Sequence, residues 1–190
     1  MNIAIFASGR GTNFSAVARA VRKGLVKADL SLLVCDNPKA GVIARAKRAG
    51  VKVVLFDDKI IQRLKEEKID LVVLAGFMRI LGPEFVREYN SRIINIHPAL
   101  LPSFKGAEAI RDAFNYGVKI TGVTVHFVDE KMDHGPIILQ QALKIEEEDT
   151  LESLEAKIHK IEHKLYPEAI RLFAEGKLRL EGRKVRITTR

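Results

Sequence analysis

The chain is poor in the residues that stack on bases or form covalent cross-links. It has no tryptophan, only 6% of its 190 residues are aromatic, and Cys35 is its single cysteine. One cysteine excludes an internal disulfide and a thiolate metal cluster, and such a chain is typical of a reducing compartment. The shortage of rings argues against a stacking platform for single-stranded nucleic acid. We therefore expect a cytoplasmic protein that does not bind nucleic acid.

Long apolar runs are also lacking. No segment approaches the roughly 20 apolar residues of a membrane span, and a strand pattern follows Met1 without a signal-peptide pattern, so we expect no membrane association. The hydrophobic content of 47% suits a globular protein, and the net charge of +8 is scattered among acidic residues rather than gathered in a basic block. This charge suits solubility or anionic small molecules.

Apolar strand patterns alternate with helical patterns through the first half of the chain. Strands are expected at 3–7, 30–35, 51–56, 71–75 and 92–97, and helices at 14–23, 40–49, 60–68 and 84–89. This alternation predicts a doubly wound, mostly parallel α/β sheet of Rossmann-like type. Without a linker or repeat, we expect a single domain, 1–190, with halves 1–97 and 98–190.

The rhythm changes in the second half. A helix is expected at 108–116, and two strands, 120–128 and 137–143, have so short a connection that they should be antiparallel. A long helix is expected from Thr150, with a capping box of Asp149 and Glu152, and Pro167 should kink or end it. A hairpin around Gly182 should close the chain.

An amide and an imidazole end the fifth expected strand. Asn95 and His97 face the same way because strand side chains alternate, and Pro98 stops the strand. Ligands of open α/β sheets bind at the carboxyl ends of strands. The pair therefore predicts a polar site at this edge, although a histidine at a strand end is also often a satisfied core residue.

A glycine-containing turn at 8–13 joins the first strand to a helix. Gly9 and Gly11 permit close ligand approach, and the helix amino terminus favours a phosphate. The turn is not a P-loop, and Phe14 occupies the third glycine position of a dinucleotide fingerprint. Two alternatives stay open: a dinucleotide site with an acid after the second strand, and an ordinary turn capped by its own Thr or Asn.

Asp133 lies in a turn-rich connection and supplies a candidate carboxylate. A carboxylate beside a histidine fixes its tautomer, and a nearby amide can donate to a carbonyl oxygen that gains charge. Without a Ser or Cys nucleophile, this set suggests direct transfer between two bound substrates. His126 has a supporting or a structural role, and His159 with Glu162 forms either a site or a solvated pair on one helix face.

The motifs together resemble the folate-dependent phosphoribosylglycinamide formyltransferase family. The resemblance covers nearly the whole chain and includes the motifs Ala7–Asn13, Leu74–Leu81, Ile94–Pro102, Thr121–Val128 and Met132–Ile138. It implies transfer of a formyl group from 10-formyltetrahydrofolate, a co-substrate, to the amine of phosphoribosylglycinamide in purine synthesis. It implies no metal, small-molecule partners only, and a monomer or homodimer.

The resemblance also implies residue roles. Asn95, His97 and Asp133 would be catalytic. The phosphate of the phosphorylated substrate would bind in the first half of the chain. The residues that hold this substrate would be Gly11, Thr12, Asn13, His159, Lys160, Ile161 and Glu162. Folate would bind at Met78, Arg79, Ile80, Leu81, Asn95, Asp129, Glu130, Lys131, Met132 and Asp133.

One feature departs from the family pattern. The segment between Phe56 and Leu71 is short, and the arginine that many members place there for the folate tail has no clear counterpart, which leaves Lys59 or Arg63 as candidates. Two rival functions remain: a formyltetrahydrofolate hydrolase with water as acceptor, and a non-enzymatic basic phosphate-binding module.

Overall fold

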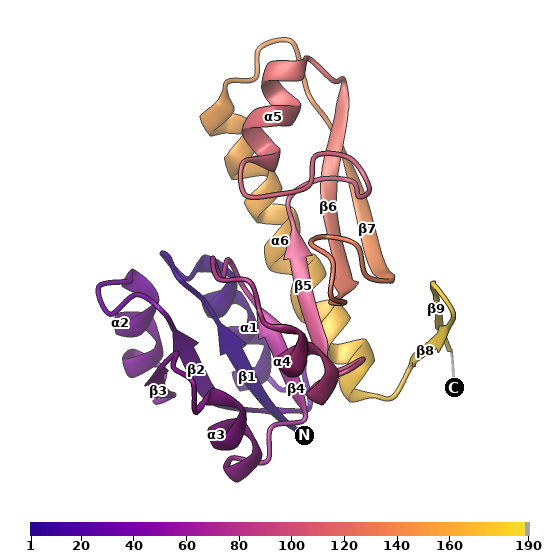
Figure 1. Ribbon diagram of the computed structural model, residues 1–190. Coiled ribbons are helices and arrows are strands. Elements are labelled where there is room, and N and C mark those ends of the chain that lie inside the picture. The colour runs from indigo at the N-terminus through magenta and orange to yellow at the C-terminus, as the bar shows by residue number, and fades with distance from the viewer. Residues whose placement is uncertain (189–190) are drawn as a thin grey trace. The chain divides into compact units, whose positions relative to one another are not determined.

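The computed structural model describes residues 1–188 and divides into two units, Met1–Asn95 and Ile96–Arg190. The first unit holds alternating strands and helices (Figure 1). They are β1 (Asn2–Phe6), α1 (Thr12–Arg22), β2 (Asp29–Cys35), α2 (Gly41–Arg48), β3 (Lys52–Leu55), α3 (Ile60–Glu66), β4 (Leu71–Leu74), α4 (Pro83–Glu88) and β5 (Ile93–His97), whose last two residues enter the second unit.

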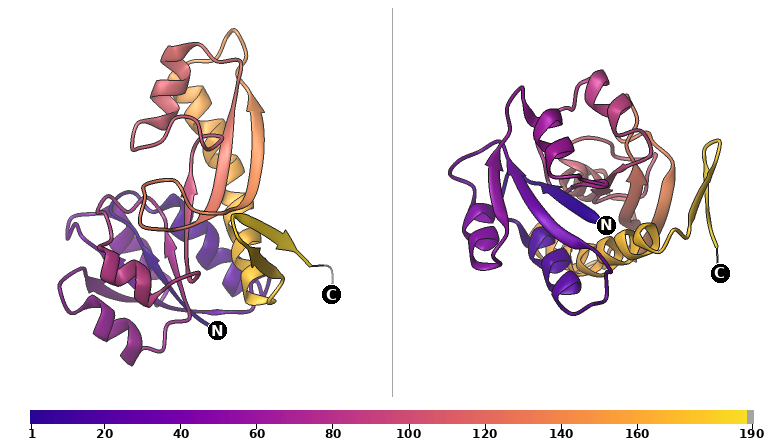
Figure 2. Two further views of the ribbon diagram at one scale, coloured as in Figure 1. Left: turned by 45° about the vertical axis from the view of Figure 1, so that its right-hand side comes forward. Right: turned by 90° about the horizontal axis from the view of Figure 1, so that it is seen from below.

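The strands of the first unit form a parallel sheet in the order β3-β2-β1-β4-β5. The chain moves one way across the sheet from β1 to β3 and the other way from β4 to β5. Right-handed crossovers therefore place α1 and α2 on one face and α3 and α4 on the other, as Figure 2 illustrates. Central residues such as Ile5, Leu33 and Val73 are fully buried, as continuous apolar strands require.

The direction of winding reverses between β1 and β4, and the glycine-containing turn lies there. The Ser8 amide donates to the Gly76 carbonyl at 3.0 Å, and the Met78 amide donates to Ser8 Oγ at 2.8 Å. These bonds join the loops that follow the two strands. The crevice at such a switch point is where open α/β sheets bind ligands.

The second unit is built on antiparallel strands and one long helix. Its elements are α5 (Ala109–Tyr116), β6 (Ile120–Phe127), β7 (Ile137–Lys144), α6 (Leu151–Ala174), β8 (Leu178–Glu181) and β9 (Lys184–Ile187). As predicted, β6 pairs antiparallel with β7, and β8 with β9 form a hairpin around Gly182. The hairpin adjoins β7 through the parallel pair Ile137 and Lys184. Helix α6 packs on β6 and β7, and α5 packs on α6.

One prediction about α6 is wrong, and a second is wrong in one of its two alternatives. Its capping box is Thr150 with Ser153, each side chain accepting from the other's amide, and not Asp149 with Glu152. Asp149 lies one residue before the cap and instead accepts from the Glu146 amide and from Ser153 Oγ. The helix does not end at Pro167 but continues to Ala174, because tertiary packing can offset a lost helical hydrogen bond. The alternative, a kink at Pro167, stays a prediction.

The single-domain assignment stays a prediction. Both units bury apolar residues of their own, such as Phe6 in the first and Val125 in the second. No helix within residues 1–188 has the length and apolarity needed to cross a membrane.

Candidate active site

Strand β5 ends at the predicted amide–imidazole pair. Asn95 and His97 are two residues apart on this strand and so lie on the same face. Asn95 is half-buried, whereas His97 is 3% exposed. A buried imidazole needs partners for its ring nitrogens, and the second unit provides them.

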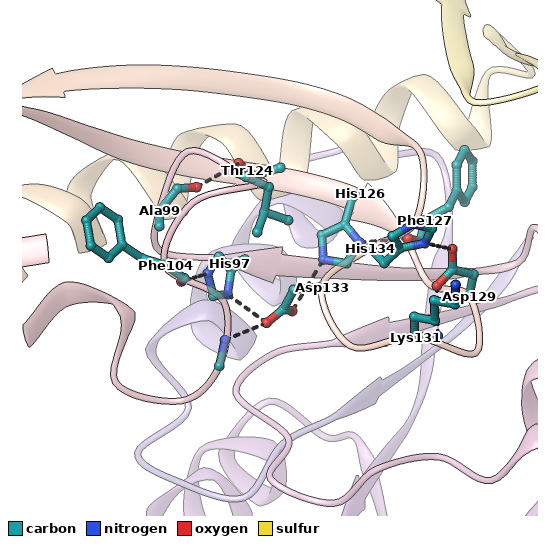
Figure 3. Close-up of polar contacts among 12 residues, drawn as sticks. His97, Ala99, Phe104, Thr124, His126, Phe127, Asp129, Lys131, Asp133 and His134 are labelled. Atoms are coloured by element: carbon teal, nitrogen blue, oxygen red, sulfur yellow. Dashed lines mark hydrogen bonds and ion pairs between the residues drawn. The ribbon is translucent and has the colours of Figure 1, made fainter. Parts of the chain in front are cut away.

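Both ring nitrogens of His97 have defined neighbours (Figure 3). Nε2 lies 2.7 Å from the Phe104 carbonyl oxygen, and Nδ1 lies 3.5 Å from Asp133 Oδ2. A carbonyl only accepts, so Nε2 must carry a hydrogen. A neutral ring would then point the lone pair of Nδ1 at the carboxylate. The geometry therefore places Nδ1 opposite the Asp133 carboxylate at ion-pair distance.

Asp133 is held by the backbone on its other side. Its Oδ2 accepts from the Gly106 amide at 2.9 Å, and its side chain is only 10% exposed. Its φ of +47° lies in the left-handed region, which Asp adopts more readily than most residues. The turn that carries Asp133 thus aims the carboxylate at the Gly106 amide and His97.

His126 lies on the far side of the same carboxylate. Its Nε2 is 3.8 Å from Asp133 Oδ1, and Nδ1 lies 2.7 Å from the Phe127 carbonyl, to which it donates. Burial lowers the pKa of His126 despite the nearby carboxylate, so its ring is neutral at neutral pH. Figure 3 shows Asp133 between the two imidazoles, which places His126 in support of the site.

Sequence reasoning missed the residues that hold the loop at 98–106. Thr124 Oγ1 donates to the Ala99 carbonyl at 2.7 Å and accepts from the Leu101 amide at 3.1 Å. Gln140 Nε2 contacts the Leu101 carbonyl at 3.1 Å and Thr124 Oγ1 at 2.9 Å. This loop carries both the Phe104 carbonyl and the Gly106 amide. By holding the loop, Thr124 and Gln140 indirectly position His97 and Asp133. A polar Thr inside a buried strand was the available signal.

The turn in the first unit is built from backbone. Gly11 is the N-cap of α1 with φ +76°, so neither Thr12 nor Asn13 is the cap. The cap makes no side-chain hydrogen bond, and the first turn of α1 contains no acidic residue. A Cβ at Gly11 would lie 2.9 Å from the Val42 Cα, which excludes a side chain there. The positive end of α1 is therefore open to an anion.

Two arginines lie beside this turn. Arg45 Nε donates to the Arg10 carbonyl at 2.7 Å, and its Nη1 lies 3.3 Å from Ser15 Oγ. Arg45 thus braces the turn from α2, while the Arg10 side chain is exposed. Both arginines add positive charge near the amino-terminal end of α1.

The predicted ribose-binding group on α6 contains a buried carboxylate. Glu162 is 4% exposed and its Oε2 lies 2.9 Å from His159 Nδ1, which contradicts the solvated-pair alternative. Burial, and then the nearby Glu162, raise the pKa of Tyr166 well above its usual value. Ile161 is buried and Lys160 is exposed.

The predicted folate residues occupy two segments. In the first unit, Met78 and Ile80 are 67% and 80% exposed, Leu81 is buried, and the Arg79 guanidinium lies 5.2 Å from the centre of the Phe56 ring. In the second, Met132 is 57% exposed beside Asp133. Such exposed apolar side chains are available to an aromatic ligand.

The two candidate residues for the folate tail, Arg63 and Lys59, have different surroundings. Arg63 Nη2 pairs with Asp57 Oδ2 at 2.7 Å, so a ligand carboxylate would compete with Asp57. The Lys59 side chain is exposed.

Comparisons with known proteins fit this geometry. The profile of the formyl transferase family matches residues 1–170. The chain belongs to the formyl transferase family. Phosphoribosylglycinamide formyltransferase of Bacillus subtilis (strain 168) is 46% identical over 179 residues, 88% of this chain and 92% of that protein. Glycinamide ribonucleotide transformylase 1 from Symbiobacterium toebii superposes with a TM-score of 0.95 at 43% identity, over 98% of this chain and 93% of that one.

These likenesses confirm the predicted fold class of this formyl transferase: a mostly parallel α/β sheet with antiparallel strands and a long helix toward the carboxyl end. A formyltetrahydrofolate deformylase from Pseudomonas syringae is also similar, with a TM-score of 0.90 at 25% identity, but this chain covers only 65% of it. The shared fold therefore does not separate transfer from hydrolysis, whereas the higher identities favour the transferases.

Proposed function

We propose that this formyl transferase moves the formyl group of 10-formyltetrahydrofolate to the amine of phosphoribosylglycinamide, giving the N-formyl product and tetrahydrofolate in purine synthesis. The observation that carries the proposal is the buried His97–Asp133 pair, at 3.5 Å, beside Asn95 at the end of β5. Such a pair exchanges a proton but offers no covalent nucleophile, so the acceptor amine itself attacks the formyl carbon.

The chemistry assigns each group a task. The neutral amine forms a C–N bond to the formyl carbon, and the formyl oxygen gains negative charge. Donation from the Asn95 amide, with the His97 imidazole nearby, stabilises that oxygen, and one such donor contributes about 3–4 kcal/mol. The amine then loses a proton to the His97–Asp133 pair, which returns one to the folate nitrogen as its C–N bond breaks.

The phosphorylated substrate needs an anion site and a ribose site. We assign its phosphate to Gly11, Thr12 and Asn13, because α1 begins without a side-chain cap or an acid. We assign its ribose and glycinamide end to Glu162 and the neighbouring residues His159, Lys160 and Ile161. A buried carboxylate accepts hydroxyl hydrogens strongly, and its accessible neighbour His159 already orders it.

The folate co-substrate is assigned to the two segments with exposed apolar side chains. These are Met78 to Leu81 and Asp129 to Asp133, together with Asn95. No group of three or more His, Cys, Asp or Glu side chains among residues 1–188 is arranged for a metal ion. Independence from metal, a cytoplasmic location and a monomeric or dimeric state remain predictions.

The reaction itself is tested with the purified protein. It is incubated with 10-formyltetrahydrofolate, with and without phosphoribosylglycinamide, and products are identified by mass spectrometry. We expect N-formylated product only when both substrates are present. Formate released equally fast without the acceptor would establish a hydrolase, and absence of both products from folded protein would return the binding-module alternative.

A further inference from the structure

The turn of the carboxyl-terminal hairpin contacts the loop that carries Asp133. Arg183, between β8 and β9, donates from Nη2 to the His134 carbonyl at 2.7 Å. Its Nη1 lies 3.1 Å from Nε2 and 3.3 Å from Nδ1 of the His134 ring. Nη1 is therefore close to both nitrogens of the ring. One side chain thus holds both the backbone and the ring of His134.

The loop that Arg183 contacts is itself hydrogen-bonded (Figure 3). His134 Nδ1 lies 2.6 Å from Asp129 Oδ2, and Asp129 Oδ1 accepts from the Lys131 amide at 2.9 Å. Burial alone would raise the pKa of Asp129, but the bonds from His134 and Lys131, with the Arg183 charge, outweigh it and lower that pKa. The loop is therefore closed between its first residue and His134.

The far end of the loop has no room to move. A Cβ on Gly135 would lie 1.8 Å from the Phe127 carbonyl oxygen, so residue 135 is pressed against the end of β6. The Phe127 amide also donates to the Pro136 carbonyl at 2.8 Å, and the next residue, Ile137, pairs with Lys184 of β9. Asp133, with its left-handed φ, thus lies two residues before this fixed anchor at Gly135.

We propose that Arg183 is a positioning residue: the carboxyl-terminal hairpin holds the 129–136 loop, and with it the Asp133 carboxylate and the folate-lining residues, in the productive arrangement. The inference deepens the proposed function, because it rests on that loop lining the folate site. Its consequence is that a residue in the terminal hairpin governs folate recognition without touching the reacting atoms.

The test compares two arginines of the same hairpin in the full-length protein. Arg183→Ala removes the contact to His134, whereas Arg186→Ala removes only an ion pair with Glu181 within the hairpin. We expect Arg183→Ala to raise the KM for 10-formyltetrahydrofolate about three- to tenfold, because small misplacements of binding groups are costly. The KM for phosphoribosylglycinamide should stay within about twofold, and Arg186→Ala should match the wild type in both. Arg183→Lys keeps the positive charge but not the planar guanidinium group. It should reverse less than half of the rise in the KM for 10-formyltetrahydrofolate that Arg183→Ala causes.

A second readout does not depend on turnover. Amide hydrogen exchange without substrates should be faster in Arg183→Ala at Lys131, whose amide bonds to Asp129, and at Gly106, whose amide bonds to Asp133. The amides of α1 serve as an internal reference. Unchanged exchange at both positions, or equal rises in both KM values, would overturn the positioning role. Faster loop exchange in a protein without transferase activity would instead support positioning while refuting the proposed function.

Discussion

The turn before α1 and the His97–Asp133–His126 cluster have different proposed functions and are built in different ways. The turn is six consecutive residues, and its useful groups are backbone amides and the end of a helix. The cluster consists of one side chain each from β5, β6 and the 129–136 loop. Binding an anion needs only local geometry, whereas proton transfer needs titratable groups from distant segments held within a few ångströms.

The two helix starts make the same distinction. Helix α6 begins with a Thr150–Ser153 capping box and with Glu152 in its first turn, so its end is satisfied by the protein itself. Helix α1 begins with a glycine that has no side-chain cap and with no acid in its first turn. Helices α2 and α3 also begin without a side-chain cap or an acid, so this feature leaves the amides of α1 available to water or a ligand without choosing between them.

The largest expected effect comes from removing the imidazole of the cluster. In His97→Ala the imidazole that we propose transfers the proton is lost, so we expect kcat to fall about 10²- to 10⁴-fold while the far-ultraviolet circular dichroism is retained. The same assay on Asp133→Ala should show a loss of similar order. A folded Asp133→Ala protein that turns over at the wild-type rate would contradict the assigned role of the carboxylate.

The glycines of the turn provide a matched pair for the local site. At Gly11 an added Cβ overlaps Val42 and must adopt φ +76°, whereas nothing lies within 4 Å of the Cβ position at Gly9. We expect Gly11→Ala to lower the free energy of unfolding by about 2–4 kcal/mol, from left-handed strain and overpacking. It should also raise the KM for the phosphorylated substrate. Gly9→Ala should stay within about 0.5 kcal/mol in urea unfolding; equal effects of the two would show that close packing does not shape this turn.

The sequence predicted the local features better than the distant contacts. Buried strands such as β1 and β4 and the turn with Gly11 follow from periodicity and glycine placement over a few residues. Strand alternation is also local, and it predicted that Asn95 and His97 share one face of β5. The partners of His97 were only candidates, since no pattern states that the Phe104 carbonyl and Asp133 flank one imidazole. The capping box was misplaced by one residue because Asp149 and Thr150 both qualify as caps, and only the backbone conformation decides between them.

Substitutions of two threonines of β6 test whether hydrogen bonds from Thr124 hold the loop at 98–106. Thr124 Oγ1 serves the Ala99 carbonyl and the Leu101 amide, whereas the buried Thr121 Oγ1 has no hydrogen-bond partner among the described residues. Thr124→Val should lower the free energy of unfolding by about 1–3 kcal/mol, because the buried Ala99 carbonyl and Leu101 amide would lose their hydrogen bonds to the Thr124 hydroxyl. It should also reduce kcat. Thr121→Val should leave stability unchanged or raise it. Chemical unfolding of both variants checks this, and equal destabilisation would mean that Thr124 acts through packing alone.

The smallest effect is expected at the start of α6, where side chains do what a ligand is proposed to do at α1. The ammonium of Lys157, the Ser153 hydroxyl and the Glu146 amide lower the pKa of Asp149 to about 2. Because the folded-state pKa lies below the unfolded value of 3.8, the stabilisation is complete above that value and is lost as the pH falls through about 2. The stability difference between wild type and Asp149→Asn should therefore be present at pH 6 and shrink below pH 4, as urea unfolding across this range will measure. A difference that does not change with pH would mean that the carboxylate acts here only as a hydrogen-bond acceptor, a role that asparagine can share. The start of α6 would then depend on its neutral Thr150–Ser153 box, and charge would distinguish the two helix starts less than the presence of a cap.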